Sequence, residues 1–456
     1  MTRFVASDRS QPFLLPPDLR DWIPEDDLAH LVVEAVDRLG MSAFKVNVRG
    51  SGSEQYNPRM MLALLIYCYA NGIFGSRRIE RATYRDVGVR FVAANKHPDH
   101  DTICAFRRQN FAAITECFLK VLELARELKL LKVGTISVDG TKIDANANKH
   151  KSVRYDRACE LREQLKLEIA DLMTKAETAD AKGEADPQAL PAEIAHRQAL
   201  TTKLDAACAR LEKQAKTQAE AERADYERRK AVHEEGRDGR NGGGKPPSPP
   251  RSTPPPEAQS NLTDPDSRLM RKNKRSEYRQ SYNAQAAVDA DGSQLVLGAR
   301  VSTCASDANE LVATVDTVPA GLGSVSTVLA DTGFANGEEV ARLQAREMEV
   351  LVATGAAKRR PHDFRPTPTK EKAEVEPRAE WRKAMKAKLE GAEARAKYKL
   401  RKQTVEPVFG IIKSVLGFRQ FLLRGVARVE LEWHLVTLAY NAKRLNGMRI
   451  AAAKVA

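Results

Sequence analysis

Apolar residues recur every three or four positions in the first part of the chain, which is the spacing of helices with one buried side. Between residues 25 and 40 this stripe predicts a helix that ends at Gly40, where a helix terminus often needs positive φ. Pro58 suits the first turn of a second helix, and the segment MMLALLIYCYANG behind it is apolar on nearly every side. That second helix must therefore be buried.

Asp101 stands where it can cap a further helix, which carries Arg107 and Arg108 and follows a helix near residues 76–83. The pair resembles a helix-turn-helix arrangement, so Arg107 and Arg108 are candidates for contact with DNA phosphates. The alternative is that these are ordinary short helices whose arginines face the solvent.

The pattern changes to strict alternation at Ile136 and Val138, which are interleaved with polar residues as in a strand. From Tyr155 the chain becomes rich in Ala, Glu, Lys, Gln and Arg, with leucines at the spacing of narrow helical seams. This predicts a helical hairpin over residues 155–236. The tract that follows, residues 237–260, is rich in Gly and Pro, so we expect a flexible linker without a packed core.

Strand signals return after that tract, where Asp291-Gly292 separates two alternating runs and predicts a β-hairpin. Alternating helices and strands follow. They are a helix at 308–315, a strand at 326–331, a helix at 337–346 and a strand at 349–354. The predicted fold class is α/β, a mixed sheet with a helical N-terminal domain and a helical-hairpin insertion between the first two strands.

The net charge of the chain indicates what kind of partner it binds. The formal net charge is +13, and residues 358–424 alone hold 19 Lys and Arg against 8 Asp and Glu. A basic excess favours a polyanionic partner such as nucleic acid, although a solvated surface is the simpler explanation of one charged segment.

The six cysteines are far apart and form no C-x-x-C pair, which favours reduced thiols in a cytoplasm. The first residues lack the apolar core of a signal peptide, and no run approaches the ~20 apolar residues of a membrane span. We therefore expect a soluble cytoplasmic protein.

Three carboxylates stand where a site could form. Asp331 ends a predicted strand just before Thr332-Gly333, and the carboxyl ends of strands are where open α/β sheets place their sites. Asp331 and Asp139, which also precedes a glycine, can equally be plain turn residues. Glu406 borders an apolar stripe on a basic helix and could be a salt-bridge partner. Together, however, such oxygen ligands suit Mg²⁺ or Mn²⁺.

Several sequence segments resemble those of DDE transposases of bacterial insertion sequences, in the same order from about residue 10 to 446. They are YNPRMMLALLIYCYANGI, RRIERATYRDV, HPDHDTI, VDGTKIDANANKHK, NLTDPDSRLM, YNAQAAVDA, LADTGF, RKQTVEPVFGIIK and GFRQFLLRG.

The resemblance implies an RNase H-like catalytic core in which Asp139, Asp331 and Glu406 bind two Mg²⁺ or Mn²⁺ ions. Such a site cleaves DNA strands by metal-dependent hydrolysis and joins them by transesterification. The long stretch between Asp139 and Asp331 would contain the inserted helices and the linker.

The family also has a motif of Tyr, Arg, Glu and Lys around its glutamate. Lys413 fits that motif seven positions after Glu406, whereas Tyr398 and Arg401 stand one residue too far away, with Lys402 where the arginine would fall. The resemblance makes Arg401 and Lys413, with Tyr398 and Lys402, candidates for binding DNA phosphates.

We therefore expect an insertion-sequence transposase associated with the nucleoid, which acts on terminal inverted repeats and target DNA as a homo-oligomer, namely a dimer. One alternative is a catalytically inactive DNA-binding relative, and another is a structural protein built around the helical hairpin. The expected division is an N-terminal DNA-binding domain (1–128), a catalytic core (129–154 and 261–446), the insertion (155–236), the linker (237–260) and a tail (447–456).

Overall fold

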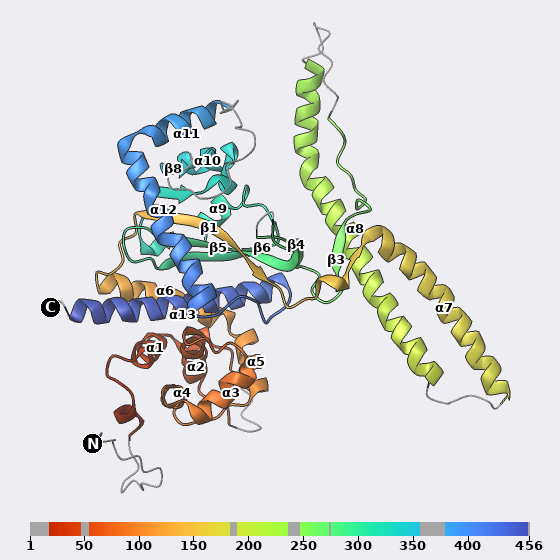
Figure 1. Ribbon diagram of the computed structural model, residues 1–456, viewed down its shortest axis with the longest axis horizontal. Coiled ribbons are helices and arrows are strands. Elements are labelled where there is room, and N and C mark those ends of the chain that lie inside the picture. Colours follow the sequence, from red (N-terminus) through yellow and green to blue (C-terminus); the bar gives the residue numbers. More distant parts are fainter. Residues whose placement is uncertain are drawn as a thin grey trace, which may run out of the picture. The chain divides into compact units, whose positions relative to one another are not determined.

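The computed structural model describes residues 18–46, 54–182, 189–235, 247–272, 275–355 and 379–454. The chain divides into two compact units (Figure 1). Unit 1 comprises Met1–Ile143 and Asn283–Ala456, and unit 2 comprises Asp144–Tyr282. None of the described helices combines the length and the apolar character needed to cross a membrane.

The N-terminal part of unit 1 is helical, as predicted. Pro58 is at the first turn of α2, and the Asn57 side chain accepts hydrogen bonds from the N–H groups of Arg59 and Met60 (2.9 and 3.4 Å). Every residue of α2 from Met61 to Ala70 is buried, which explains its apolar character on all sides. The helices are α1 (Leu28–Asp37), α2 (Pro58–Ala70), α3 (Ser76–Arg85), α4 (Val87–Val92), α5 (His100–Gln109) and α6 (Phe111–Glu127), with short 3-10 turns at Leu19–Trp22 and Met41–Ala43.

The cap of α5 differs from the prediction. Asp99, and not Asp101, is the N-cap, because its carboxylate accepts hydrogen bonds from the N–H groups of Asp101 and Thr102, both at 2.9 Å. Asp101 lies within the first turn, where a negative charge still suits the helix dipole.

The predicted mixed sheet is present in unit 1. Its strands lie in the order β6-β5-β1-β7-β8, with β1 parallel to β7, β7 parallel to β8, and β5 antiparallel to β6. The turn between β5 and β6 contains Asp291-Gly292, as expected. The strands are β1 (Thr135–Asp144), β5 (Arg279–Asp289), β6 (Val296–Ser302), β7 (Thr327–Ala330) and β8 (Glu349–Val352).

The remaining helices of unit 1 follow β6 in the chain. The first, α9, begins at Leu311 and not at Ala308, because the preceding residues form a turn in which Glu310 N–H donates to the carbonyl of Asp307 (3.1 Å). The remaining elements are α10 (Gly337–Gln344), α11 (Glu380–Glu390), α12 (Ala392–Gly410), a π-helix (Ile411–Val415) and α13 (Val426–Ala453). Residues 358–378 of the basic segment lie outside the described residues.

The long helix α13 lies between the sheet and the N-terminal helices of unit 1, where it contacts β6, α2 and α6 (Figure 1). Its Asn441 side chain bonds both the N–H and the carbonyl of Val296 (2.8 and 2.7 Å), and Trp433 donates to the carbonyl of Gln285 (2.9 Å). These side-chain bonds to strand backbone fix the helix on the sheet.

A buried ion pair connects α13 with the N-terminal helices. Glu432 is fully buried and accepts from the N–H groups of Leu422 and Leu423 (2.8 and 3.0 Å). Arg107, only 3 % exposed, lies 3.8 Å from Glu432 and donates to the Tyr69 hydroxyl at 2.6 Å. The predicted contact of Arg107 with DNA is therefore wrong for this conformation, because its guanidinium has structural partners. Arg108, the next residue, is exposed.

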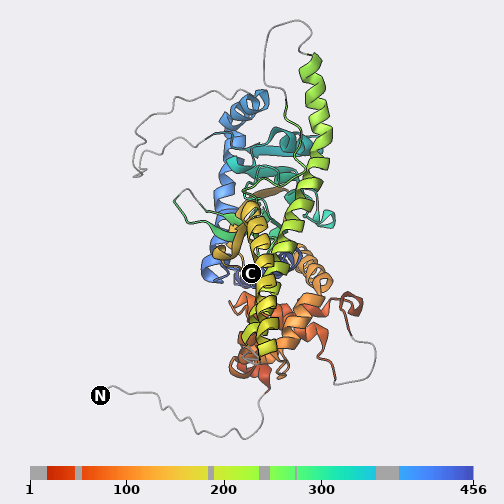
Figure 2. The ribbon, with the colours of Figure 1, turned by 90° about the vertical axis from the view of Figure 1, so that its right-hand side faces the viewer.

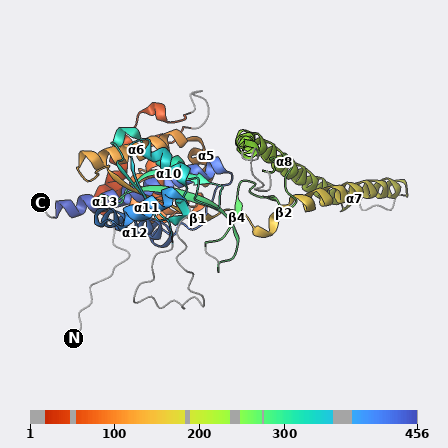
Figure 3. The same cartoon turned by 90° about the horizontal axis from the view of Figure 1, so that it is seen from above.

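Unit 2 contains the predicted pair of helices, α7 (Tyr155–Lys182) and α8 (Ala189–Glu235), which pack against each other (Figure 3). Leu165 of α7 and Leu204 and Leu211 of α8 are buried in their seam. At its base, β2 (Ser152–Arg154) pairs antiparallel with β3 (Gln259–Asn261), and β4 (Arg268–Met270) pairs with the first residues of β5. This unit is wider than the insertion expected from sequence.

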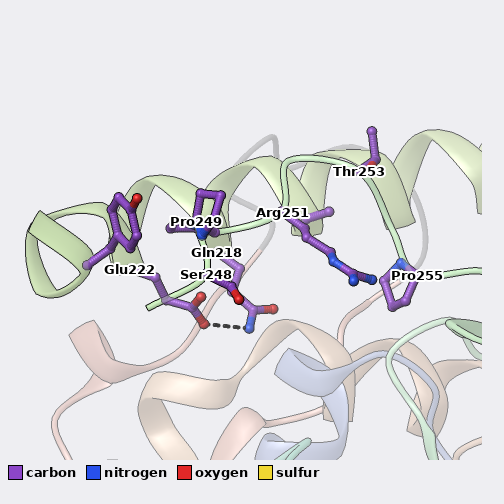
Figure 4. A pocket seen from close by; sticks show the side chains of 10 residues that line it. Gln218, Glu222, Ser248, Pro249, Arg251, Thr253 and Pro255 are labelled. Carbon is purple, nitrogen blue, oxygen red and sulfur yellow. Dashed lines mark hydrogen bonds between the residues drawn. The ribbon is translucent and has the colours of Figure 1, made fainter. Parts of the chain in front are cut away.

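The Gly- and Pro-rich tract is only partly described, since residues 236–246 lie outside the described residues. Its later half is not an unpacked linker. Ser248, Pro249 and Arg251 line a pocket with Gln218 and Glu222 of α8 (Figure 4), and Pro254 is buried. Proline needs no N–H partner, so this segment can lie along a helix in extended form without an unsatisfied donor.

We predict that Arg107→Met lowers the free energy of unfolding by about 3–5 kcal/mol, because it leaves the Glu432 carboxylate buried without its cation. Urea denaturation followed by circular dichroism measures this change. The matched control Arg108→Met removes an exposed neighbour and should stay within about 0.5 kcal/mol of the parent. Equal stability of the two variants would contradict the structural role of Arg107.

Candidate active site

Two aspartates meet at the carboxyl end of the central parallel strands. Val138 of β1 is paired with Ala330 of β7, so Asp139 and Asp331 occupy the next position on each chain. Neighbouring strands lie about 4.8 Å apart, and residues in register on parallel strands point to the same face. The register therefore brings together two carboxylates that are far apart in sequence.

The third predicted carboxylate reaches the same place from α12, which packs against β7. Figure 2 shows α12, in blue, alongside the strands of the sheet. The Arg401 guanidinium lies between the two elements. Its Nη1 is 3.5 Å from Asp139 Oδ2, and its Nη2 donates to Glu406 Oε1 at 3.0 Å. Arg401 is only 9 % exposed, whereas Glu406 remains about half exposed. One guanidinium thus bridges Asp139 and Glu406.

Burial and a neighbouring charge alter the acidity of Asp139. Burial is the main cause that raises the pKa of this carboxyl to about 7, and the Asp331 charge raises it further. The Gly140 N–H, which donates to Asp139 Oδ1 at 2.8 Å, and the Arg401 guanidinium oppose this rise. In the absence of metal, Asp139 holds a proton over much of the range below neutrality.

Asp331 also has the turn role that its sequence context suggested. Its side chain caps a 3-10 turn at Thr332–Phe334 by accepting a hydrogen bond from Gly333 N–H (2.8 Å). The turn and site roles are compatible, because one carboxylate oxygen is enough for the cap.

A further aspartate, which the sequence analysis missed, lies beside Asp331. A Cβ on Gly333 would lie 2.9 Å from Asp331 Oδ1 and 3.5 Å from Asp307 Oδ2, so both carboxylates face the same point. Asp307 Oδ1 accepts hydrogen bonds from Asn283 (2.6 Å) and Gln285 (2.7 Å). It also pairs with Lys142 at 3.5 Å.

A sequence signal for Asp307 did exist in strand β5. Asn283 and Gln285 are two residues apart and therefore share one face of the strand, yet both are fully buried. Buried amides need partners, which points to a polar group opposite them. Gly140 is also required here, because a Cβ would lie 2.4 Å from Gln285 Nε2 and 2.6 Å from Asp307 Oδ1.

Lys413 reaches strand β1 from the π-helix that follows α12. Its ammonium donates to the carbonyl of Lys142 (3.1 Å) and to the hydroxyl of Thr141, which lies two residues beyond Asp139 on the same face of the strand. Single-turn π-helices often occur at functional sites, where they redirect a side chain.

Tyr398 lies beside the carboxylates. Its ring is half-buried against Leu329 and Leu351, and this burial is the main cause that raises the pKa of its hydroxyl, while the Asp331 charge raises it further and a hydrogen bond with Arg401 opposes the rise. Lys402 is exposed on α12 and forms no ion pair among the described residues. Arg108 is exposed on α5. The structure therefore groups Arg401, Tyr398 and Lys413 with the carboxylates, but not Lys402 or Arg108.

The donor set is chemically suited to hard divalent cations, because it consists of carboxylate oxygens. Within the described ranges, no three His, Cys, Asp or Glu side chains are arranged closely enough to hold a metal ion. Arg401 accounts for this, since its guanidinium separates Asp139 from Glu406. Metal ligation by both residues would require Arg401 to move.

We predict that Asp139 titrates near pH 7 in the metal-free protein and that Asp331→Asn moves this midpoint to lower pH, because it removes a neighbouring charge. The folded pKa lies above the ordinary 3.8, so the contribution of this group to stability falls as pH rises from about 4 to 7. Carbon-13 NMR of the carboxyl measures the midpoint. Asp316→Asn, at an exposed residue paired with Arg346, should leave it unchanged. An unshifted midpoint in Asp331→Asn would contradict the proximity of the two aspartates.

Two family models match the chain. A transposase DDE domain matches residues 252–442, which include Asp331 and Glu406, and the transposase domain DUF772 matches residues 17–109, which include α1 to α5. Asp139 lies outside both ranges, on the strand that precedes unit 2. Searches of curated proteins and of solved structures found no match. The two domains and the mixed sheet, an RNase H-like core, show that the chain belongs to the DDE transposases of insertion sequences.

Proposed function

We propose that this transposase binds the terminal inverted repeats of its element as duplex DNA and catalyses strand cleavage and strand transfer. Asp139, Asp331 and Glu406 are the proposed catalytic residues and the ligands of two Mg²⁺ or Mn²⁺ ions. The observation that supports this proposal best is the convergence of these three carboxylates, two through strand register and one through Arg401.

Two bound ions would activate the attacking oxygen and stabilise the leaving 3′ oxygen of the phosphodiester. The chain itself needs no nucleophilic side chain, because water attacks in cleavage and the freed 3′ hydroxyl attacks in strand transfer. Its carboxylates must be ionised to bind cations, so cation binding would release the proton that Asp139 holds below about pH 7.

Arg401 has two successive roles in this proposal. Without metal it neutralises Asp139 and Glu406, whose negative charges would otherwise repel each other. When divalent cations replace it, its guanidinium is free to hold a phosphate through paired charge-assisted hydrogen bonds. Lys413 provides a second cation beside β1. Tyr398 supports α12 through its packing, and Lys402 contacts flanking phosphate from the exposed side of that helix.

Asp307 is a positioning residue in this proposal. Its bonds to Asn283 and Gln285 fix the carboxylate, and the fixed carboxylate holds Lys142 on β1, three residues beyond Asp139. Strand β1 therefore has partners on both of its faces, which limits the movement of Asp139.

Pairing of two transposon ends requires two copies of a site that binds one end at a time, so we propose that the active species is a homodimer on DNA. The basic residues of α11 and α12 would lie along transposon-end or target phosphates, which predicts strong dependence of binding on salt concentration.

We predict that purified protein cleaves labelled transposon-end duplex in Mg²⁺ or Mn²⁺. Asp139→Asn, Asp331→Asn and Glu406→Gln should each reduce cleavage by at least about 100-fold, because each removes a metal-ligating oxygen. DNA binding in a mobility-shift assay should change little. Asp316→Asn is the control and should cleave like the parent. Binding without cleavage by the parent protein would select the inactive relative, and the absence of both would contradict the proposal.

We predict that Arg401→Ala raises affinity for Mn²⁺ while cleavage falls. Removing one charge-assisted bond of about 1.5 kcal/mol frees the carboxylates and should increase affinity about tenfold. Isothermal titration calorimetry with Mn²⁺ measures the affinity, and Arg395→Ala on the same helix, which has no ion pair among the described residues, is the control. Weaker Mn²⁺ binding in Arg401→Ala would show that Arg401 does not compete with the cation.

A further inference from the structure

Helix α3 carries the densest group of exposed arginines among the N-terminal helices of unit 1. Its sequence is SRRIERATYR, and four of its ten residues are arginines. Ile79 and Thr83 are buried against the rest of the domain. The four arginines are all exposed, and they are Arg77, Arg78, Arg81 and Arg85.

The arginines share one side of the helix. At about 100° per residue, the four arginines and Tyr84 fall within an arc of about 120°. The buried Ile79 and Thr83 lie opposite the middle of this arc. We call the side formed by Arg77, Arg78, Arg81, Tyr84 and Arg85 the α3 face. From Arg77 to Arg85 it extends about 12 Å along the helix axis.

The charges of the α3 face are not neutralised within the described part of the chain. None of its four arginines forms an ion pair or a side-chain hydrogen bond among the described residues. The only acid of the helix, Glu80, is instead bonded to His100 at 2.9 Å. By contrast, Arg38 is exposed but bonded to both Glu34 and Glu127. The α3 face therefore has uncompensated positive charge.

An aromatic pair stiffens one edge of this face. Tyr84, 58 % exposed, stacks on His97 with ring centroids 3.9 Å apart and an angle of 10° between the rings. The His97 ring is itself held by a hydrogen bond between its Nδ1 and Thr83 Oγ1 (3.1 Å). The planar surface beside the arginines is thus fixed before any partner binds, which reduces the ordering that binding would require.

We propose that the α3 face is the surface that docks onto duplex DNA at the transposon ends, with its four arginines on the phosphate backbone. This inference rests on the proposed function for its partner. It goes beyond that function by assigning the contact to α3, whereas the sequence pattern suggested Arg107 and Arg108 of α5. An α-helix with its side chains is about 10–12 Å across, so it fits the major groove, which is about 12 Å wide. Arginine also forms paired bonds with phosphate oxygens.

The test measures binding of the full chain to transposon-end duplex by fluorescence anisotropy in EDTA, over a series of salt concentrations. Because no divalent cation is present, the result does not depend on the carboxylate site. Arg77→Ala, Arg78→Ala, Arg81→Ala and Arg85→Ala, combined in one variant, should weaken binding at least about tenfold. The slope of log affinity against log salt should become shallower by about 3.6, which is about 0.9 for each of four lost phosphate contacts.

Two controls accompany this variant. Arg38→Ala removes an exposed arginine that is already paired and should leave the salt slope unchanged. Replacing the same four arginines with lysine should restore most of the slope, because the charges are kept. Circular dichroism checks that each variant is folded.

An unchanged slope and affinity in the folded alanine variant would overturn the proposal. Equal loss of binding to duplex RNA and to an acidic peptide would also overturn it, because it would show a surface for polyanions in general. Loss of DNA binding in this variant, together with no cleavage by the parent protein in Mg²⁺, would support the α3 face while contradicting the proposed catalysis.

Discussion

Carboxylates brought close together repel one another unless a cation lies near them, and this constraint governs the site of this transposase. The Arg401 guanidinium lies between Asp139 and Glu406 and interacts with both. Burial and the neighbouring Asp331 charge raise the pKa of Asp139 to about 7, so this carboxyl keeps its proton below that pH. The folded chain therefore limits the repulsion in two ways before any metal arrives, with an internal cation and with protonation. Both are reversible, as a site that must later accept divalent ions requires.

The position of Glu406 depends on packing far from the carboxylates. Helix α12 contacts β7, and the chain then continues into α13, which is fixed on β5 and β6 by Trp433 and Asn441. On its other side, α13 holds the N-terminal helices through the buried pair of Glu432 and Arg107. Burial raises the pKa of Glu432, so this pair is stable only because Arg107, Tyr69 and backbone N–H groups surround it.

Much of this architecture could be predicted from sequence, because periodicity reports burial directly. The alternation at Ile136 and Val138 and the turn at Asp291-Gly292 correspond to β1 and to the turn between β5 and β6. Arg107 was misassigned, since its partner Glu432 lies on a helix more than three hundred residues later, and no local pattern reveals such a pair. Asp307, in the loop after β6, was missed because its partners Asn283 and Gln285 point to it only once both amides are known to be buried on one face of β5. The contact of Arg401 with both Asp139 and Glu406 could not be predicted either, because β1 and α12 are brought together only in the folded chain.

The base of unit 2 explains how the long segment of residues 144–282 can be inserted between two strands of the sheet. Strands β2 and β3 pair with each other, and Asp144 is bonded to Arg279, so the chain leaves and returns through adjacent, hydrogen-bonded segments. A loop whose ends are already clamped adds little closure entropy as it grows. Helices of other lengths could therefore replace α7 and α8 at this point, and related enzymes could differ widely in size while retaining the same catalytic sheet.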